Sequence, residues 1–351
     1  MINNKQFTKV GIIGFGGYVP SLRIKIGEIA EAYGKSGEQV TGSLGVKQKA
    51  VAKKDEDTVS LAVEAIRTAL LRTEMDKNKI GAVLIGSESH PYSVKPTGSM
   101  VGEILGLENE YLTADLEFAC KAGTSGLILI AGLIEAGLIE AGIAVGADVA
   151  QSRPGDALEY TAGAGAGAII LGNKKFAWLA KLNFVNSLSS DTPDFWRREG
   201  QQYPSHAGRF TAGPAYFKHV IGSTQRFLAK TRTEISAYQH VVLHMPNVKF
   251  PQRAGVKLGV TKKQLDLGFL VPDIGNPYSA SSLLGLINVL EQGEKGEKVL
   301  VTSYGSGAGS DNFSLQIEKR LIKDKFDLKS QFKKIEYINY AEYLKLRQGK
   351  K

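Results

Sequence analysis

Short apolar runs alternate with segments of helical spacing through both halves of the chain. The runs have the length of buried strands and end in glycine or polar residues, as strands in layered proteins commonly do. The segment 58–71 is the clearest amphipathic helix, and Asp57 or Thr58 is its expected N-cap. This alternation predicts an α/β fold of stacked layers with mostly parallel sheets.

The expected strands are 9–15, 82–86, 112–118, 142–147, 166–171, 177–185, 238–243 and 298–304. The expected helices are 26–33, 58–71, 97–105, 215–230 and 279–292. A further small and apolar segment, 126–146, has helical spacing, and the stretch 127–147 is long enough to span a bilayer. Glu135 and Glu140 near its middle are costly in lipid, so we expect a buried central helix instead.

Length and composition place the chain among globular proteins. A chain of 351 residues with 43% hydrophobic and 23% charged residues can bury a large core, and we expect two similar halves, 1–172 and 173–351. The single cysteine allows no internal disulfide, and the first residues lack the apolar core of a signal peptide. We therefore expect a cytoplasmic protein without membrane spans.

The net charge of +9 is concentrated near the C-terminus. Residues 318–351 contain eleven Lys/Arg against five Asp/Glu, which leaves +6 in this segment. The segment lacks a nucleic-acid-binding motif, so we expect a solvated surface and no nucleic-acid partner. Individual lysines or arginines elsewhere could still bind a phosphorylated ligand.

The glycine-rich runs differ in what they predict. The run 11–17 does not fit the dinucleotide-binding pattern, and the chain contains no Walker A motif. The run 163–168 leads straight into an apolar strand, which indicates close backbone packing. The run 304–309 follows a buried strand, so its N–H groups could form an oxyanion pocket. The histidines and the cysteine show no metal-ligand spacing, and we expect neither a metal nor a resident cofactor.

Cys120 is the only cysteine, and it lies between an expected strand and an expected helix. Unpaired N–H groups and the dipole at a helix N-terminus favour an anion, so we expect a lowered thiol pKa and a reactive nucleophile. A lone cysteine is otherwise commonly buried and inert. The remaining polar groups of the chain decide between these interpretations.

Four chemically different side chains occupy the same kind of position, in a polar turn after an expected buried strand. They are the carboxylate of Glu88, the thiol of Cys120, the imidazole of His244 and the amide of Asn276. A thiol can carry an acyl group, a base can remove the proton next to a thioester carbonyl, and an acid can protonate the acceptor oxygen. The set therefore suits acyl transfer followed by carbon–carbon bond formation.

Long stretches of the chain resemble the archaeal-type hydroxymethylglutaryl-CoA synthases, a branch of the thiolase superfamily. The resemblance covers nearly the whole chain and includes the stretches 10–20, 86–97, 115–124, 194–198, 208–217, 244–246, 303–307 and 335–340. It implies a thiolase-like fold of two pseudo-duplicated halves in αβαβα layers. It also implies a dimeric acyltransferase of isoprenoid synthesis that condenses acetyl-CoA with acetoacetyl-CoA in the mevalonate pathway.

The resemblance further implies a role for individual residues. Cys120 accepts the acetyl group, Glu88 deprotonates its methyl group, and His244 holds and protonates the acetoacetyl ketone. The remaining implied contacts are Thr161, Thr211, Asn276 and Ser306 for the substrate and Lys249 and Arg253 for CoA. His90, His206, His219 and His240 are expected to be structural, with His206 nearest to the pocket rim.

Family members of this type also resemble one component of an assembly with an acetoacetyl-CoA thiolase and a small zinc-containing OB-fold protein. Two alternatives remain. A β-ketoacyl-acyl-carrier-protein synthase would use Cys120, His244 and Asn276, although Glu88 and the residues around Cys120 argue against it. A silent CoA-binding scaffold subunit would have no reason to keep Glu88, Cys120 and His244 together.

Overall fold

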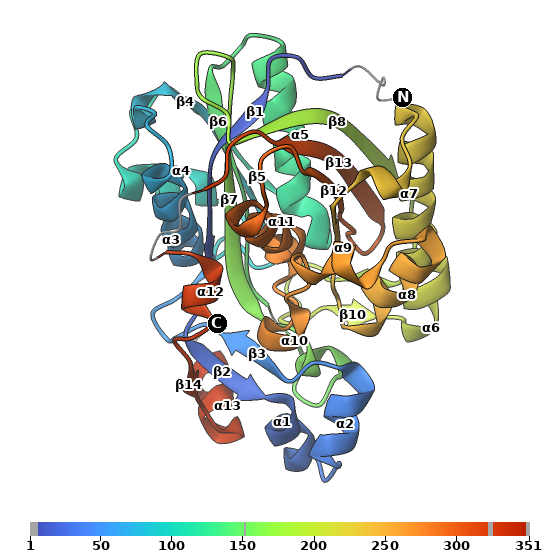
Figure 1. Cartoon of the computed structure of the whole chain (residues 1–351). Helices are drawn as coiled ribbons and strands as arrows, with labels where there is room; N and C mark the ends of the chain where they lie inside the picture. The colour runs from blue at the N-terminus through green and yellow to red at the C-terminus, as the bar shows by residue number, and fades with distance from the viewer. Residues whose placement is uncertain (1–5, 151, 322–325, 349–351) are drawn as a thin grey trace.

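The computed structural model describes residues 6–150, 152–321 and 326–348. A sheet of nine strands runs through it, and Figure 1 shows its arrangement. The strand order is β11-β12-β13-β8-β1-β7-β6-β4-β5. The bounds are β1 (Gly11–Tyr18), β4 (Ile80–Gly86), β5 (Leu112–Leu116), β6 (Ala141–Val149), β7 (Ala164–Gly172), β8 (Ala180–Ser189), β11 (His240–Leu243), β12 (Lys298–Thr302) and β13 (Gly309–Ile317).

The expectation of mostly parallel sheets is wrong. Strand β4 is parallel to β5 and β6, and β11 is parallel to β12. The other five neighbouring pairs are antiparallel. Two of these, β6–β7 and β12–β13, join consecutive strands without an α-helical crossover, and a direct return of the chain makes neighbours antiparallel.

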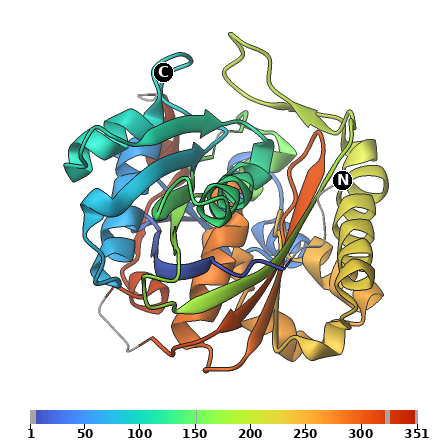
Figure 2. The same ribbon diagram turned by 90° about the horizontal axis from the view of Figure 1, so that it is seen from above.

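The layers have the expected αβαβα order. Helices α5 (Ala122–Glu135) and α11 (Ser281–Gln292) lie in the centre, with strands on both sides (Figure 2). Helices α3 (Thr58–Leu71) and α4 (Thr97–Leu105) cover one outer face, and α7 (Lys218–Thr231) and α8 (Lys249–Leu258) cover the other. Helix α11 is buried along nearly its whole length because β1 and β7 pack against one side of it and β11 and β12 against the other. Helix α5 packs against β4, β5, β6 and β7 and leaves Leu129 exposed.

Smaller elements surround these layers. A second sheet has the order β14-β2-β3, and β9 pairs with β10. Their bounds are β2 (Leu22–Lys25), β3 (Gln48–Val51), β9 (Phe195–Trp196), β10 (Ser205–His206) and β14 (Glu336–Tyr337). The other helices are α1 (Ile26–Ala32), α2 (Gly37–Leu44), α6 (Gly208–Phe210), α9 (Lys262–Asp266), α10 (Val271–Ile274), α12 (Leu328–Gln331) and α13 (Tyr340–Gln348).

The best-predicted helices have clear end signals. Helices α3 and α4 have the expected bounds, and the Asp57 carboxylate accepts from the Ser60 N–H at 2.9 Å in a capping box. The expected helix 126–146 is wrong beyond Glu135, because Gly137 adopts φ +78° and the chain then enters β6. The expected helix 215–230 starts later, at Lys218, after a π-helical stretch over Thr211–Phe217.

The basic C-terminal segment is only partly a solvated surface. Lys345 on α13 is exposed, whereas the Arg347 guanidinium lies 3.3 Å from the fully buried carboxylate of Glu159. Residues 322–325 and 349–351 of the segment lie outside the described residues. Among the described ranges, no helix has both the length and the apolar character needed to cross a membrane.

The strands of residues 1–172 occupy one end of the sheet order and those of residues 173–351 the other, with β1 beside β8. We propose that the chain consists of two halves, residues 1–172 and residues 173–351.

Gly86 sets the distance between the two elements that carry the candidate site. A Cβ atom at Gly86 would lie 2.2 Å from the Gly123 nitrogen and 2.3 Å from the Ala122 carbonyl carbon. The absence of a side chain therefore lets the end of β4 touch the first turn of α5. This close approach brings Glu88 and Cys120 together.

We predict that Gly86→Ala lowers the free energy of unfolding by about 1–3 kcal/mol, because the backbone atoms it meets cannot move aside cheaply. Gly132→Ala is the matched control, since Gly132 lies exposed within α5 with open space around its Cα. This control should gain about 0.5–1 kcal/mol from lower chain entropy. Urea denaturation measures both, and equal effects would contradict the close approach.

Candidate active site

Cys120 lies where the sequence predicts, between β5 and α5. A single 3-10 turn, Ala119–Lys121, joins the two elements, and Ala119 adopts φ 44°, a left-handed conformation uncommon for alanine. The thiol is buried, and its Sγ donates to Glu88 Oε1 at 3.0 Å. The nucleophile candidate and the base candidate are therefore in direct contact.

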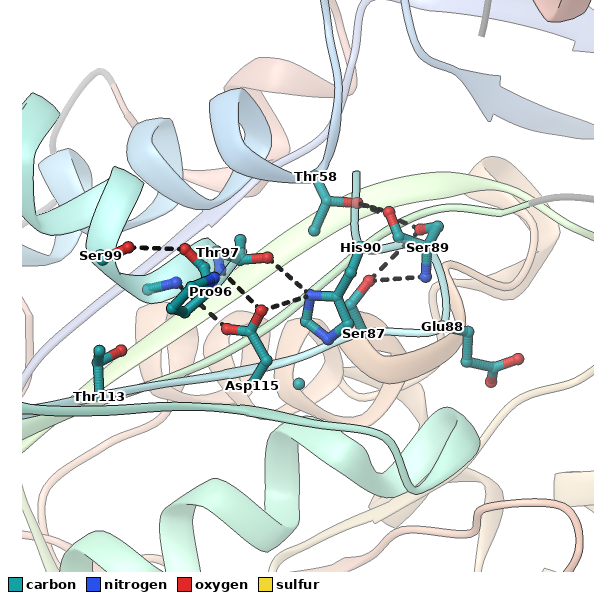
Figure 3. Close-up of polar contacts among 12 residues, drawn as sticks. Thr58, Ser87, Glu88, Ser89, His90, Pro96, Thr97, Ser99, Thr113 and Asp115 are labelled. Atoms are coloured by element: carbon teal, nitrogen blue, oxygen red, sulfur yellow. Dashed lines mark hydrogen bonds and ion pairs between the residues drawn. The ribbon is translucent and has the colours of Figure 1, made fainter. Parts of the chain in front are cut away.

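Glu88 lies in the turn that follows β4, and its carboxylate points away from the polar network that holds this turn (Figure 3). The Asp148 carboxylate accepts from the Glu88 N–H at 2.8 Å and from the Ser87 and Ser89 hydroxyls. At the far end of the turn, His90 Nδ1 lies 2.8 Å from Thr97 Oγ1 and 3.4 Å from Asp115 Oδ2. The turn is thus fixed while its functional carboxylate stays free to face the thiol.

Burial changes the proton affinity of both groups. Burial, and then the charge of Asp148, raise the pKa of Glu88 to about 8. Burial, and then the charge of Glu88, raise the pKa of the Cys120 thiol. The expected lowering of the thiol pKa is therefore wrong, because removal from water beside a carboxylate outweighs the helix N-terminus. The thiol holds its proton at rest, and Glu88 is the group placed to accept it.

Asn276 and Thr161 complete the surroundings of the sulfur. The Asn276 side chain hydrogen-bonds Cys120, which favours the thiolate and partly offsets the effect of burial. The Thr161 carbonyl accepts from the Asn276 N–H at 2.7 Å and thereby fixes the backbone that carries this amide. Tyr278 and Ala162 form a small buried apolar cluster with Cys120.

His244 follows β11 and is buried, with no hydrogen-bond partner for Nδ1 among the described residues. Burial lowers the pKa of its imidazole to about 3, so the ring is neutral at ordinary pH. Its ring centroid lies 6.1 Å from that of Tyr304, which stands two residues before Ser306 in the chain. The imidazole therefore lies beside the start of the loop that carries Ser306.

A cavity of about 700 Å³ opens beside Glu88, and Ser306 lines the same cavity. Asp194 holds the loop around Ser306, since its carboxylate accepts from the Tyr304 hydroxyl at 2.6 Å and from the Gly307 N–H at 2.8 Å. Arg197 at the cavity wall donates to the Glu88 carbonyl at 3.1 Å. The space is large enough for the acyl part of a substrate, with the carboxylate on its wall.

The other three expected contacts lie further out. Lys249 is exposed at the start of α8, and Arg253 lies one turn later with its guanidinium 5.1 Å from the centre of the Phe217 ring. Thr211 begins the π-helical stretch whose Tyr216 hydroxyl donates to the His244 carbonyl at 2.7 Å. No direct contact joins these three residues to Cys120 or Glu88 in the described part of the chain.

The remaining histidines have structural partners. His206 Nε2 lies 3.0 Å from Asp156, His240 Nε2 lies 2.8 Å from Glu297, and His219 contacts Ser190 and the Ala215 carbonyl. His90 is held by Thr97 and Asp115 as described above. No group of three or more histidine, cysteine or acidic residues is arranged around a metal site in the described ranges.

Sequence reasoning missed Asp148 and gave Asp194 no role. Asp148 is fully buried and also accepts from the N–H and the hydroxyl of Ser279, so it joins the Glu88 turn to the segment that follows Asn276. A signal was present, since Asp148 stands in the polar end of an apolar strand, the same position type as Glu88 and His244. The expected strand 142–147 places Asp148 directly after it, but no chemical role was assigned to that position.

Comparison with known proteins agrees with this geometry. The family model described as hydroxymethylglutaryl-coenzyme A synthase N terminal matches residues 6–176. Hydroxymethylglutaryl-CoA synthase of Methanobrevibacter smithii is 49% identical over 342 residues, with 96% of this chain and 98% of the relative covered. The same enzyme of Methanocaldococcus jannaschii is 50% identical over 340 residues, with the same coverage.

Solved structures show the same fold. MvaS in complex with 3-hydroxy-3-methylglutaryl coenzyme A is 25% identical with a TM-score of 0.86, and the match covers 97% of this chain and 92% of that one. The 3-oxoacyl-(acyl carrier protein) synthase III of Pseudomonas aeruginosa has a TM-score of 0.80 at 23% identity, covering 90% and 100%, and shows the fold alone. The thiolase-like fold is thus confirmed. With near-full-length relatives at about half identity, the chain belongs to the hydroxymethylglutaryl-CoA synthase family of acyltransferases.

Proposed function

We propose that this site condenses acetyl-CoA with acetoacetyl-CoA and water to give (3S)-3-hydroxy-3-methylglutaryl-CoA and free CoA. The observation that carries the proposal is the buried 3.0 Å contact between Cys120 Sγ and Glu88 Oε1. A thiol that must be acylated and a carboxylate that must reach the resulting acetyl methyl group have to be neighbours. The family membership of the chain supports the same reaction.

In the first step, Cys120 attacks the carbonyl carbon of acetyl-CoA while its proton passes to Glu88. The tetrahedral intermediate collapses to acetyl-Cys120, and the departing CoA thiolate takes up a proton. Glu88 is ionised again when that proton leaves it. N–H groups near Cys120 and Ser306 stabilise the oxyanion of the tetrahedral intermediate. Stabilisation of this kind is usually the largest electrostatic contribution to the rate of acyl transfer.

In the second step, Glu88 removes a proton from the acetyl methyl group. The resulting carbanion attacks the ketone carbon of acetoacetyl-CoA, and the ketone oxygen takes a proton as the new bond forms. The N–H of the neutral His244 imidazole can hold this oxygen and pass it a proton, and the ring regains a proton from water, to which the protonated Glu88 releases its own. Water then hydrolyses the thioester to Cys120 and releases the product with a free carboxylate.

The substrate contacts are proposed in the same way. Asn276 and Ser306 line the acetoacetyl site, Thr161 supports Asn276, and Thr211 lies on the segment beside His244. Lys249 and Arg253 contact the CoA phosphates. CoA thioesters are substrates, and we propose no resident cofactor or metal.

We also propose a cytoplasmic homodimer that associates with an acetoacetyl-CoA thiolase and a small zinc-containing OB-fold protein. The support for these partners is the resemblance to archaeal-type family members. Light scattering on the chain alone, and after mixing with the two purified proteins, measures both kinds of association. A monomer that binds neither protein would contradict this part of the proposal.

Glu88→Gln should slow both steps of the reaction. The amide keeps the shape of the carboxylate but cannot accept a proton, so condensation from preformed acetyl-Cys120 should fall by roughly two to four decades. Acetylation, in which Glu88 takes the Cys120 proton, should also be slower than in the wild type. Cys120→Ser should lose both reactions with an intact fold. Rapid-quench assays with labelled acetyl-CoA measure the two steps, and a Glu88→Gln enzyme that condenses normally from preformed acetyl-Cys120 would show that the roles are misassigned.

The rate of condensation should rise with pH up to about pH 8. The base must be ionised, and the pKa of Glu88 is raised to about 8, so the ionised fraction falls about tenfold for each pH unit below that value. Single-turnover rates of preacetylated enzyme with acetoacetyl-CoA provide the measurement. His244, neutral above about pH 3, should contribute no step between pH 5 and 8. A flat profile in this range would exclude Glu88 as the base.

Lys249→Ala and Arg253→Ala should each raise the Michaelis constant for CoA thioesters about threefold to fivefold, with little change in kcat. Exposed cations act on phosphates through a field that salt screens, so the effect should shrink at high ionic strength. Lys262→Ala on α9 is the control for removing an exposed lysine and should change neither constant. Loss of kcat at an unchanged Michaelis constant would show that the CoA phosphates do not bind to Lys249 and Arg253.

A further inference from the structure

A buried ion pair lies directly beside the nucleophile. Lys121, the residue after Cys120, places its Nζ 3.0 and 3.2 Å from the two carboxylate oxygens of Asp311 on β13. The Lys121 side chain is 3% exposed and that of Asp311 is 0% exposed. Two charges removed from water in this way are costly unless geometry and hydrogen bonding compensate.

Hydrogen bonding does compensate here. The Asp311 carboxylate also contacts the hydroxyls of Thr124 at 2.9 Å and Ser187 at 2.7 Å. Lys121 Nζ donates to the Ser125 hydroxyl at 2.7 Å and lies 4.0 Å from the centre of the Phe118 ring. The pair thus ties the turn of Cys120 and the first turn of α5 to β13 and β8.

The stem of Lys121 packs against the loop that carries Ser306. A Cβ atom on Gly305 would lie 2.9 Å from Lys121 Cγ, and one on Gly309 would lie 2.8 Å from Lys121 Cε. These two glycines flank Ser306 and pair with each other through N–H to carbonyl bonds of 2.8 and 2.9 Å. The lysine therefore spans from the nucleophile turn, along the base of this loop, to the strand that follows it.

From this arrangement we infer that Lys121 and Asp311 are positioning residues, which fix the Cys120 sulfur relative to the oxyanion-binding loop at Ser306. The inference rests on the proposed role of Cys120 as the acyl carrier. Acyl transfer needs the sulfur and the oxyanion donors in register, and a misplacement of about 1 Å can cost roughly a hundredfold in rate. The pair touches neither substrate nor reacting atoms in this account, so its effect acts through Cys120 and the loop.

The test removes both charges together, so that neither is left buried alone. Lys121→Met with Asp311→Asn keeps an apolar stem between Gly305 and Gly309 but removes the ionic tether. The matched control is Arg72→Met with Glu291→Gln, which removes another buried pair, 3.0 Å apart with side chains 2% and 3% exposed. This pair joins the residue that caps the end of α3 to α11. Thermal unfolding reports the stability loss of each double variant.

Acetylation of Cys120 at saturating acetyl-CoA should be slower by roughly ten- to a hundredfold in the first double variant and unchanged in the control. Alkylation of Cys120 by iodoacetamide needs the thiol but no oxyanion site, so it should proceed at the wild-type rate in both. Wild-type acetylation in the first variant, an equal loss in the control, or an equal loss of alkylation would each overturn the inference.

Lys121→Gln gives the same comparison if the first double variant does not fold, because it keeps a hydrogen-bond donor while shortening the reach to Asp311. Slower acetylation with normal alkylation supports the inference, and normal acetylation overturns it. Wild-type protein that never forms acetyl-Cys120 would instead contradict the proposed function, so the two failures are distinguishable.

Discussion

The hydrogen bond between the buried thiol of Cys120 and the buried carboxylate of Glu88 is the contact on which the candidate site depends. Burial raises the pKa of both groups, and the charge of Glu88 raises that of the thiol further, whereas the hydrogen bond from Cys120 lowers the pKa of Glu88. The pair therefore keeps a proton at rest and can pass it from sulfur to oxygen when an acyl group arrives. The same carboxylate then stands next to the acetyl methyl group, so one contact serves both steps of the reaction.

The fold makes this contact by bringing strand ends together and fixing each with a buried acid. Gly86 lets β4 touch α5, Asp148 holds the Glu88 turn, Asp194 holds the loop of Ser306, and Asp311 receives Lys121 from the nucleophile turn. Each of these carboxylates accepts several hydrogen bonds, and these bonds offset the free energy that is lost when a charged group leaves water. The loops of the site are thus rigid although they lie outside regular structure.

Local signals in the sequence were sufficient for much of this arrangement. The bounds of α3 and α4 were predictable because periodicity and end residues agree, and the turn at Cys120 was predictable from the strand before it and the small residues after it. Glu88 and His244 were found by their positions after apolar strands, and the resemblance supplied their implied roles. Asn276 was expected after a buried strand and follows helix α10 instead. The antiparallel centre of the sheet and the end of α5 at Glu135 depend on strand order and on the backbone at Gly137, which periodicity does not report. The raised thiol pKa and the role of Lys121 depend on neighbours distant in sequence, so no local pattern could indicate them. Asp148 stands at a strand end, which is a local signal, but its partners Ser87 and Ser279 are distant in sequence.

The most direct measurement is the fate of the acetyl group in a single turnover of the unmodified protein. Labelled acetyl-CoA is added, the protein is quenched and digested, and the labelled peptide is identified before and after addition of acetoacetyl-CoA or malonyl-acyl-carrier protein. We expect one acetyl group as a thioester on Cys120, which acetoacetyl-CoA discharges into hydroxymethylglutaryl-CoA while malonyl-acyl-carrier protein leaves it in place. Label on another residue, or discharge by malonyl-acyl-carrier protein alone, would contradict the account.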